Sequence, residues 1–187
     1  MDLKLVVIGS GTQNYTCVDS TSYSKPVANG AVADLFDVSC IASHTSDAES
    51  ILGKLPQLVL HNLHVIHEKN FPKIGVHYFY PDSSTPVFRI SSGKKKGLFV
   101  GQKLENVPAP AYADAGLPPD AFGAVDWLKL GTKDNVLTTN GKPLKSKGYK
   151  AVYRVETAGG KAPMTCQGRP AYFTIPYAAQ YGECSLC

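Results

Sequence analysis

Apolar and polar side chains alternate with a period of two over much of this chain, and that alternation predicts β-strands. At the start, the apolar run Leu3–Ile8 meets Gly9-Ser10-Gly11, and in residues 12–17 Gln13, Tyr15 and Cys17 share one face. We expect a strand that bends at the glycines and continues as a second strand. Further strands are predicted over 74–80, 85–90, 97–104, 149–157 and 171–181, the last broken or bulged at Pro176.

Helical signals are few. A short helix is expected from Asp47, capped by Ser46 and ended by Gly53 and Pro56. Residues 31–40 fit either a short helix or a strand, and the same ambiguity holds for 58–68. Residues 106–123 contain four prolines and predict a long ordered loop or lid, with Tyr112 and Phe122 as its apolar contacts.

Composition agrees with an all-β protein. The 187 residues include 17 Gly, 13 Pro, 10 Tyr and 7 Phe, and only 18% are charged. This turn-rich, aromatic composition and the β-meander in the middle of the chain predict one domain, residues 1–187. The expected fold class is all-β, a mainly antiparallel barrel or sandwich, with one or two short helices and the long proline-rich loop.

The glycines near the start raise the question of a nucleotide site. A dinucleotide fold needs a third Gly or Ala three residues after Gly11, followed by a helix. That position is Asn14, and the residues after it are β-branched, aromatic and turn-forming. The chain is therefore not expected to be a dinucleotide-dependent dehydrogenase.

Charge and hydropathy exclude several partners. The net charge is +4 and the lysines are scattered, except for Lys94-Lys95-Lys96, which lies between Ser-Ser-Gly and Gly and predicts a hairpin tip. We therefore expect no nucleic-acid binding. There is no apolar run of 18 residues, so we expect no membrane span, and we expect no signal peptide in this chain.

Histidines and cysteines offer two kinds of site. His61, His64 and His67 lie close together, but only Glu68 is a nearby carboxylate, so a packed or surface element is the more frequent role and a metal site the alternative. The five cysteines favour disulfides if the chain is extracellular, with Cys17 bonded to Cys40 or to Cys166. In that compartment Asn14-Tyr15-Thr16 is an N-glycosylation acceptor.

The chemistry suggested by the residues is binding. No G-x-S-x-G elbow and no facing carboxylate pair is evident, whereas the aromatic strands can line a pocket for an apolar or conjugated molecule. Arg154 is a partner for an acidic head group. A secreted hydrolase, metal-dependent through the histidines, and a lectin-like module are the alternatives, and a homo-oligomer stays open. The candidate ligand-binding residues are His77, Tyr78, Phe79, Tyr80, Phe88, Tyr112, Trp127, Tyr153, Arg154, Phe173 and Tyr177.

Several segments together resemble a fungal and bacterial family of extracellular proteins of unknown function, whose fungal members are often mislabelled malate dehydrogenase. The segments are GTQNYTC (11–17), IGVHYFYP (74–81), GAVDWLKL (123–130), VYRVETAGGKAPMTC (152–166) and FTIPYAAQY (173–181). The resemblance covers most of the chain, and the histidine cluster and the Cys184/Cys187 tail depart from it.

This resemblance implies a secreted or cell-surface protein. It singles out His77, Cys17 and Cys166, and we expect a Cys17–Cys166 bond that joins the first and last thirds of the chain. It also suggests similarity to the mushroom chromoproteins of the pink oyster type. By that analogy the ligand is a non-covalent polyene pigment or another apolar small molecule.

Overall fold

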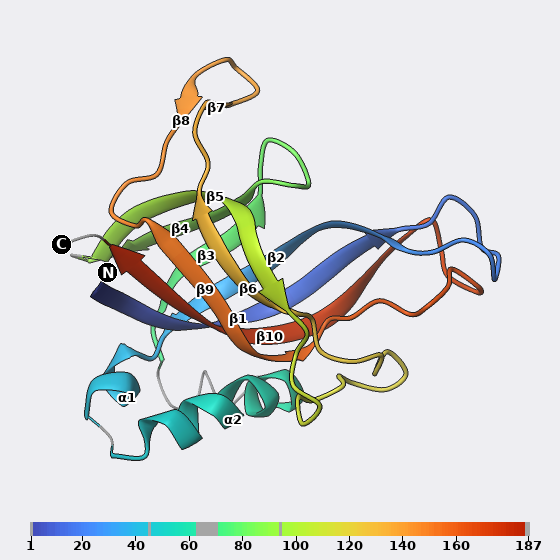
Figure 1. The fold of residues 1–187 in the computed structure, drawn as a ribbon, viewed down its shortest axis with the longest axis horizontal. Helices are drawn as coiled ribbons and strands as arrows, with labels where there is room; N and C mark the ends of the chain where they lie inside the picture. The colour runs from blue at the N-terminus through green and yellow to red at the C-terminus, as the bar shows by residue number, and fades with distance from the viewer. Residues whose placement is uncertain (1, 45, 63–70, 94, 186–187) are drawn as a thin grey trace.

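The computed structural model describes residues 2–44, 46–62, 71–93 and 95–185, and it is a closed antiparallel barrel in the order β1-β10-β9-β6-β5-β4-β3-β2 (Figure 1). A small separate sheet pairs β7 with β8. The predicted all-β fold class is confirmed. The elements are β1 (Asp2–Thr16), β2 (Val27–Asp37), α1 (Ser39–His44), α2 (Ala48–His61), β3 (Lys73–Phe79), β4 (Pro86–Ser92), β5 (Lys95–Val107), β6 (Trp127–Thr132), β7 (Val136–Leu137), β8 (Pro143–Leu144), β9 (Ala151–Gly159) and β10 (Tyr172–Ser185).

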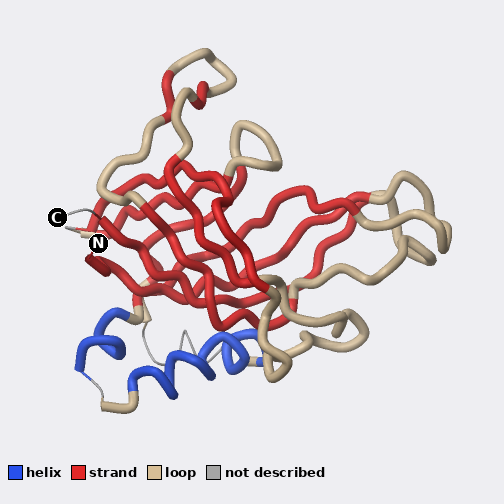
Figure 2. Tube along the Cα trace, in the orientation of Figure 1, coloured by secondary structure: helices blue, strands red, loops and turns tan. Residues whose placement is uncertain are grey.

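Side-chain alternation separates an inner core from an outer one. Val7 and Tyr181 lie opposite each other on β1 and β10, and both are buried inside the barrel with Phe88. Their sequence neighbours point outward, where Val6 and Ile8 pack against the apolar face of α2. The two helices therefore cover one side of the barrel (Figure 2), and each strand there is buried on both faces.

The first strand differs from the expectation. β1 is a single strand of 15 residues that pairs with β10 on one side and β2 on the other, not two strands joined by a bend. Its glycines serve close packing. A Cβ at Gly11 would overlap the carbonyl oxygen of Val32, and one at Gly9 would lie 2.6 Å from the Tyr181 ring.

Helix α2 is longer than expected. It runs from Ala48 to His61 through both Gly53 and Pro56, and Asp47, not Ser46, is its N-cap residue. The predicted end was wrong because tertiary burial outweighs the local breakers. Leu52, Leu55, Val59 and Leu60 form a buried stripe against the barrel, which stabilises the helix beyond its propensity.

The first ambiguous segment, 31–40, contains both kinds of structure, whereas in the second segment residues 58–61 belong to α2 and 63–68 lie outside the described residues. Residues 27–37 form β2, and α1 then begins at Ser39. The predicted strand break at Pro176 was wrong, because β10 keeps its register with β1 through this residue. Pairing of β10 with β9 begins only at Tyr177, so the proline lies where one ladder is absent.

Loops follow the turn and proline signals. Residues 108–126 form the long proline-rich loop between β5 and β6. The lysine hairpin joins β4 to β5, with Ser92 opposite Lys95, and Lys94 itself lies outside the described residues. Asn140-Gly141 turns between β7 and β8, where Gly141 has a φ of 73°.

A disulfide ties together the two loops that project beyond one end of the barrel. Cys17 and Cys166 are bonded with 5.9 Å between their Cα atoms, as expected. Cys17 follows β1, and Cys166 lies in the loop between β9 and β10, so the bond links chain regions that are 149 residues apart. Figure 2 shows these loops projecting side by side from the strands. We call them together the tip (residues 17–26 and 160–171).

Candidate ligand cavity in the barrel

A cavity of about 650 Å³ occupies the end of the barrel nearest the tip. Inward-facing residues of the strands supply its floor, and two loop segments, 124–126 and 161–164, supply one wall. A volume of this size is typical of a small-molecule site. Its lining residues are Gln13, Tyr15, Ala28, His77, Phe79, Ser84, Pro86, Phe88, Lys103, Ala124, Val125, Asp126, Leu128, Leu130, Arg154, Lys161, Ala162, Pro163, Met164 and Tyr181.

The floor of the cavity is aromatic and contains one buried histidine. His77 stacks on Phe88, with ring centroids 4.1 Å apart. Its Nδ1 donates a hydrogen bond of 3.0 Å to the carbonyl oxygen of Val87, and since a carbonyl can only accept, the neutral ring keeps its lone pair on Nε2. Burial lowers the pKa of His77 to about 4. The imidazole is therefore uncharged at neutral pH.

Arg154 places a positive charge in the same cavity. Its Nε and Nη2 donate hydrogen bonds of 3.1 and 2.8 Å to the carbonyl oxygen of Asp126. Among the described residues no carboxylate forms an ion pair with Arg154. The carboxylate of Asp126 instead accepts a hydrogen bond of 3.1 Å from Asn106. A half-buried guanidinium without a carboxylate partner among the described residues favours an anionic ligand.

Gln13 adds an unpaired donor to the cavity. Its Nε2 is buried and has no hydrogen-bond partner among the described residues. Next to it on the same strand face, the Tyr15 hydroxyl donates a bond of 2.7 Å to the carbonyl oxygen of Gly160, and burial raises the pKa of Tyr15 to about 12. Tyr15 thus holds the wall, while Gln13 is available to a ligand acceptor.

The loop wall is fixed to the barrel by backbone bonds. Val125 N donates to Gly159 O at 3.0 Å, and Lys161 N donates to Gly123 O at 3.1 Å. The Thr157 hydroxyl donates a bond of 2.6 Å to the Val125 carbonyl. The end of the proline-rich loop is therefore held beside the end of β9, where Ala124 and Gly160 form an isolated antiparallel β-bridge. Of the two residues expected to contact the pocket from this loop, Phe122 packs beside the disulfide, and neither it nor Tyr112 lines the cavity.

The structure brings together part of the predicted site. His77, Phe79, Phe88 and Arg154 all line the cavity. Tyr177 lies deeper in the core, where its hydroxyl is 3.0 Å from that of Tyr181.

The other predicted aromatic residues lie elsewhere. Phe173 stacks on Tyr15 with centroids 5.5 Å apart, beside the disulfide. Tyr78 lies between the inward residues His77 and Phe79 of β3 and points outward. Tyr80 follows β3, and its hydroxyl oxygen accepts a hydrogen bond of 2.8 Å from Thr139 N. Trp127 and Tyr153 line a shallow groove of about 200 Å³ on the outer face of the barrel. Tyr112 is 75% exposed.

The sequence did not identify Gln13 and Tyr15 of β1, or Tyr181 of β10, as residues that line the cavity. The period-two pattern placed Gln13 and Tyr15 on one face with Cys17, and that was the available signal. Nothing in the local sequence marks Tyr181 as a cavity residue, because its position depends on the pairing of β10 with β1.

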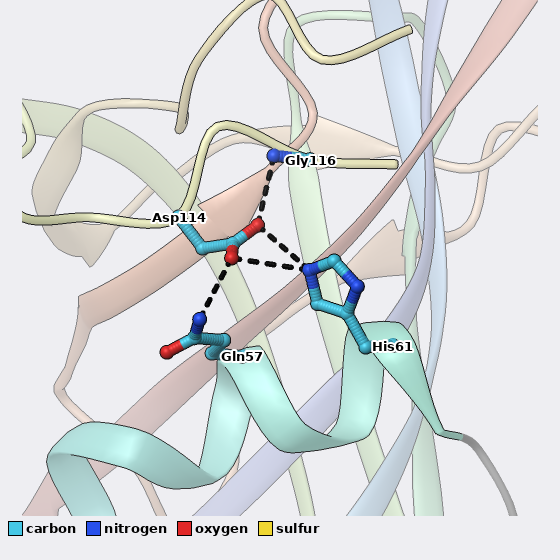
Figure 3. Close-up of polar contacts among 4 residues, drawn as sticks. All are labelled: Gln57, His61, Asp114 and Gly116. Atoms are coloured by element: carbon cyan, nitrogen blue, oxygen red, sulfur yellow. Dashed lines mark hydrogen bonds and ion pairs between the residues drawn. The ribbon is translucent and has the colours of Figure 1, made fainter. Parts of the chain in front are cut away.

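A second polar cluster joins α2 to the proline-rich loop (Figure 3). The Asp114 carboxylate lies 3.1 Å from His61 Nε2 and accepts bonds of 2.9 Å from both Gln57 Nε2 and Gly116 N. These contacts anchor the loop to the helix. Of the expected histidine cluster only His61 is described. His64 and His67 lie outside the described residues, and the described part of the chain holds no group of three metal-ligating side chains.

Comparison with known proteins gives the family. Residues 1–182 match the model of the family described as "Protein of unknown function (DUF3455)", and the chain belongs to that family. No curated protein and no solved structure matches the chain. Among the described residues, no helix is long and apolar enough to cross a membrane.

Proposed function

We propose that this protein is a non-enzymatic binder of a small apolar or conjugated molecule held in the barrel cavity. The observation that carries the proposal is the lining itself, in which the aromatic floor of Phe79 and Phe88 lies in the same cavity as Arg154. Apolar walls with a few fixed polar groups are typical of small-molecule sites. Burial of an apolar chain supplies affinity, and the polar groups set its orientation.

The ligand's polar end is assigned to Arg154 and Gln13. The guanidinium has no carboxylate partner among the described residues, and Gln13 Nε2 has no acceptor there. A carboxylate would satisfy both donors, with a charge-assisted bond to Arg154. The remaining apolar chain would then lie over Phe88 and Leu128. A conjugated carboxylic acid, such as a polyene pigment, fits this division of the cavity.

The first test is to identify what the native protein carries. Protein purified from its own source, which we propose to be the secreted or cell-surface fraction, is examined by absorption spectroscopy and native mass spectrometry. The expected result is one apolar small molecule per chain, with visible absorption if the ligand is a polyene. A colourless native protein overturns the pigment assignment. A native mass equal to that of the chain alone overturns the proposal that the protein carries any bound small molecule.

The second test addresses the role of Arg154. A fatty acid and its methyl ester are titrated into the wild type, Arg154→Met, and the control Arg89→Met, whose arginine is exposed on the outer face of β4. Loss of the charge-assisted bond is expected to weaken acid binding about tenfold or more in Arg154→Met and to leave ester binding nearly unchanged. Equal effects on acid and ester would contradict the assigned orientation.

Carbohydrate binding is the second candidate, and it rests on the outer groove. Trp127 and Tyr153 present aromatic side chains there, beside the ion pair of Lys129 with Glu105 at 2.6 Å. Aromatic faces with a polar rim suit a sugar ring. Trp127→Ala is the test, because it removes glycan binding under this candidate and leaves binding in the barrel cavity intact.

A further inference from the structure

The tip carries the most exposed large hydrophobic side chains among the described residues. Val18 is 93% exposed, Tyr23 94% and Met164 88%. All belong to the disulfide-linked loops beyond the end of the barrel that contains the cavity. Exposed apolar residues are ordinary when scattered, but a cluster at one end of a molecule marks an interaction surface.

The loop that presents Val18 and Tyr23 is internally braced. Asp19 Oδ1 accepts bonds of 2.6 Å from the hydroxyls of Thr21 and Ser24 and one of 3.1 Å from the Thr21 backbone. Cys166 N donates a bond of 2.8 Å to Ser24 O, next to the disulfide. The apolar side chains therefore project from a braced loop, and little backbone conformational entropy is lost when they dock.

The tip is continuous with the wall of the cavity. The segment 161–164 lines the cavity and ends two residues before the disulfide-bonded Cys166. Met164 belongs to both features, since it lines the cavity and is exposed at the tip. A surface that covers the tip would therefore lie against the cavity wall, where an apolar ligand could transfer without crossing water.

We propose that the tip docks on a lipid surface and that ligand passes between that surface and the cavity, an inference that rests on the proposed function. Lys25 and Lys161 are exposed on the same loops, where they suit anionic head groups. An amphipathic Tyr together with Val and Met is suited to the boundary between head groups and acyl chains. Three exposed apolar side chains are too few for the packed core of a stable protein interface.

The test measures vesicle binding and ligand transfer separately. Mixed phosphatidylcholine–phosphatidylglycerol vesicles are floated with the wild type, Val18→Ser/Tyr23→Ser, Met164→Gln, and the control Leu137→Ser. Leu137 is also an exposed hydrophobic residue, but it lies in the β7–β8 hairpin (Figure 1). Affinity for a free polyene fatty acid is measured without vesicles, and its transfer from vesicles is followed by fluorescence.

The tip variants are expected to bind vesicles about tenfold more weakly than the wild type and to take up ligand from them correspondingly more slowly. Affinity for free ligand in Val18→Ser/Tyr23→Ser and both properties of Leu137→Ser are expected to match the wild type. A wild type that does not float with vesicles, or tip variants that float equally well, would overturn the docking proposal. Failure to bind free ligand would instead overturn the proposed function.

Discussion

The imidazole of His77 lies parallel to the phenyl ring of Phe88, with centroids 4.1 Å apart and ring planes 14° apart. The two residues face each other across β3 and β4, both on the inner side of the barrel. Stacking and the bond to Val87 fix a neutral histidine in the cavity floor. The site therefore includes a polar atom, Nε2, that does not add charge to an apolar surface.

This histidine predicts lower stability in acid. Its pKa is about 4 in the folded protein, because of burial, and 6.5 ordinarily. Between those values the unfolded chain binds a proton that the folded chain does not, so His77 lowers stability as the pH falls from 6.5 to 4, by up to about 1.4 kcal/mol per pH unit. The free energy of unfolding of His77→Phe, measured in urea, is expected not to show this decrease between pH 6.5 and 4. A pH slope equal to that of the wild type would contradict the assignment.

Glu183 predicts the opposite dependence. It is fully buried, and burial raises the pKa of its carboxyl from 4.5 to about 8. As the pH rises from 4.5 to 8, the unfolded chain releases a proton that the folded chain keeps, so stability falls by up to about 1.4 kcal/mol per pH unit. Glu183→Gln is expected to be more stable than the wild type at pH 8 in guanidinium unfolding, with little difference at pH 4. Destabilisation at pH 8 would show that the carboxylate is needed there.

The disulfide predicts a large contribution to stability. It closes a segment of 149 residues, and in the chain-entropy model such a closure stabilises the folded state by about 3–5 kcal/mol. Cys17→Ser/Cys166→Ser is expected to unfold at a correspondingly lower denaturant concentration. Coincident unfolding midpoints for the variant and the oxidised wild type would contradict this contribution.

Adding one methyl group at Gly11 is expected to destabilise the folded protein strongly. A Cβ there would overlap the backbone of Val32, whereas at Gly182 the nearest atom is the end of the Leu3 side chain, 3.2 Å away. Gly11→Ala is expected to cost more than about 2 kcal/mol, and the control Gly182→Ala less than about 1 kcal/mol. Thermal unfolding compares the two. Equal melting temperatures would show that β1 and β2 can separate at this point.

The sequence was sufficient for the fold class and for some of the site. Period-two alternation put His77 and Tyr78 on opposite faces of one strand, but it did not show which face points inward. Turn signals located the hairpins. Alternation also explains why the candidate Tyr78 faces outward, because it lies between the inward residues His77 and Phe79. The pairing of β10 with β1, which places Tyr181 opposite Val7, depends on contacts between residues far apart in the chain. Helix α2 passes Gly53 and Pro56 because its apolar stripe is buried.

Binding in the barrel cavity is the central claim, and a fluorescent polyene fatty acid tests it most directly. The ligand is titrated into the wild type, Leu128→Trp and Tyr153→Trp. Leu128 lines the cavity, while Tyr153 lies on the outer face of the adjacent strand. Saturable binding of one ligand per chain to the wild type and to Tyr153→Trp, with its loss in Leu128→Trp, is the predicted result. Undiminished binding to folded Leu128→Trp, or no binding to the ligand-free wild type, would contradict it.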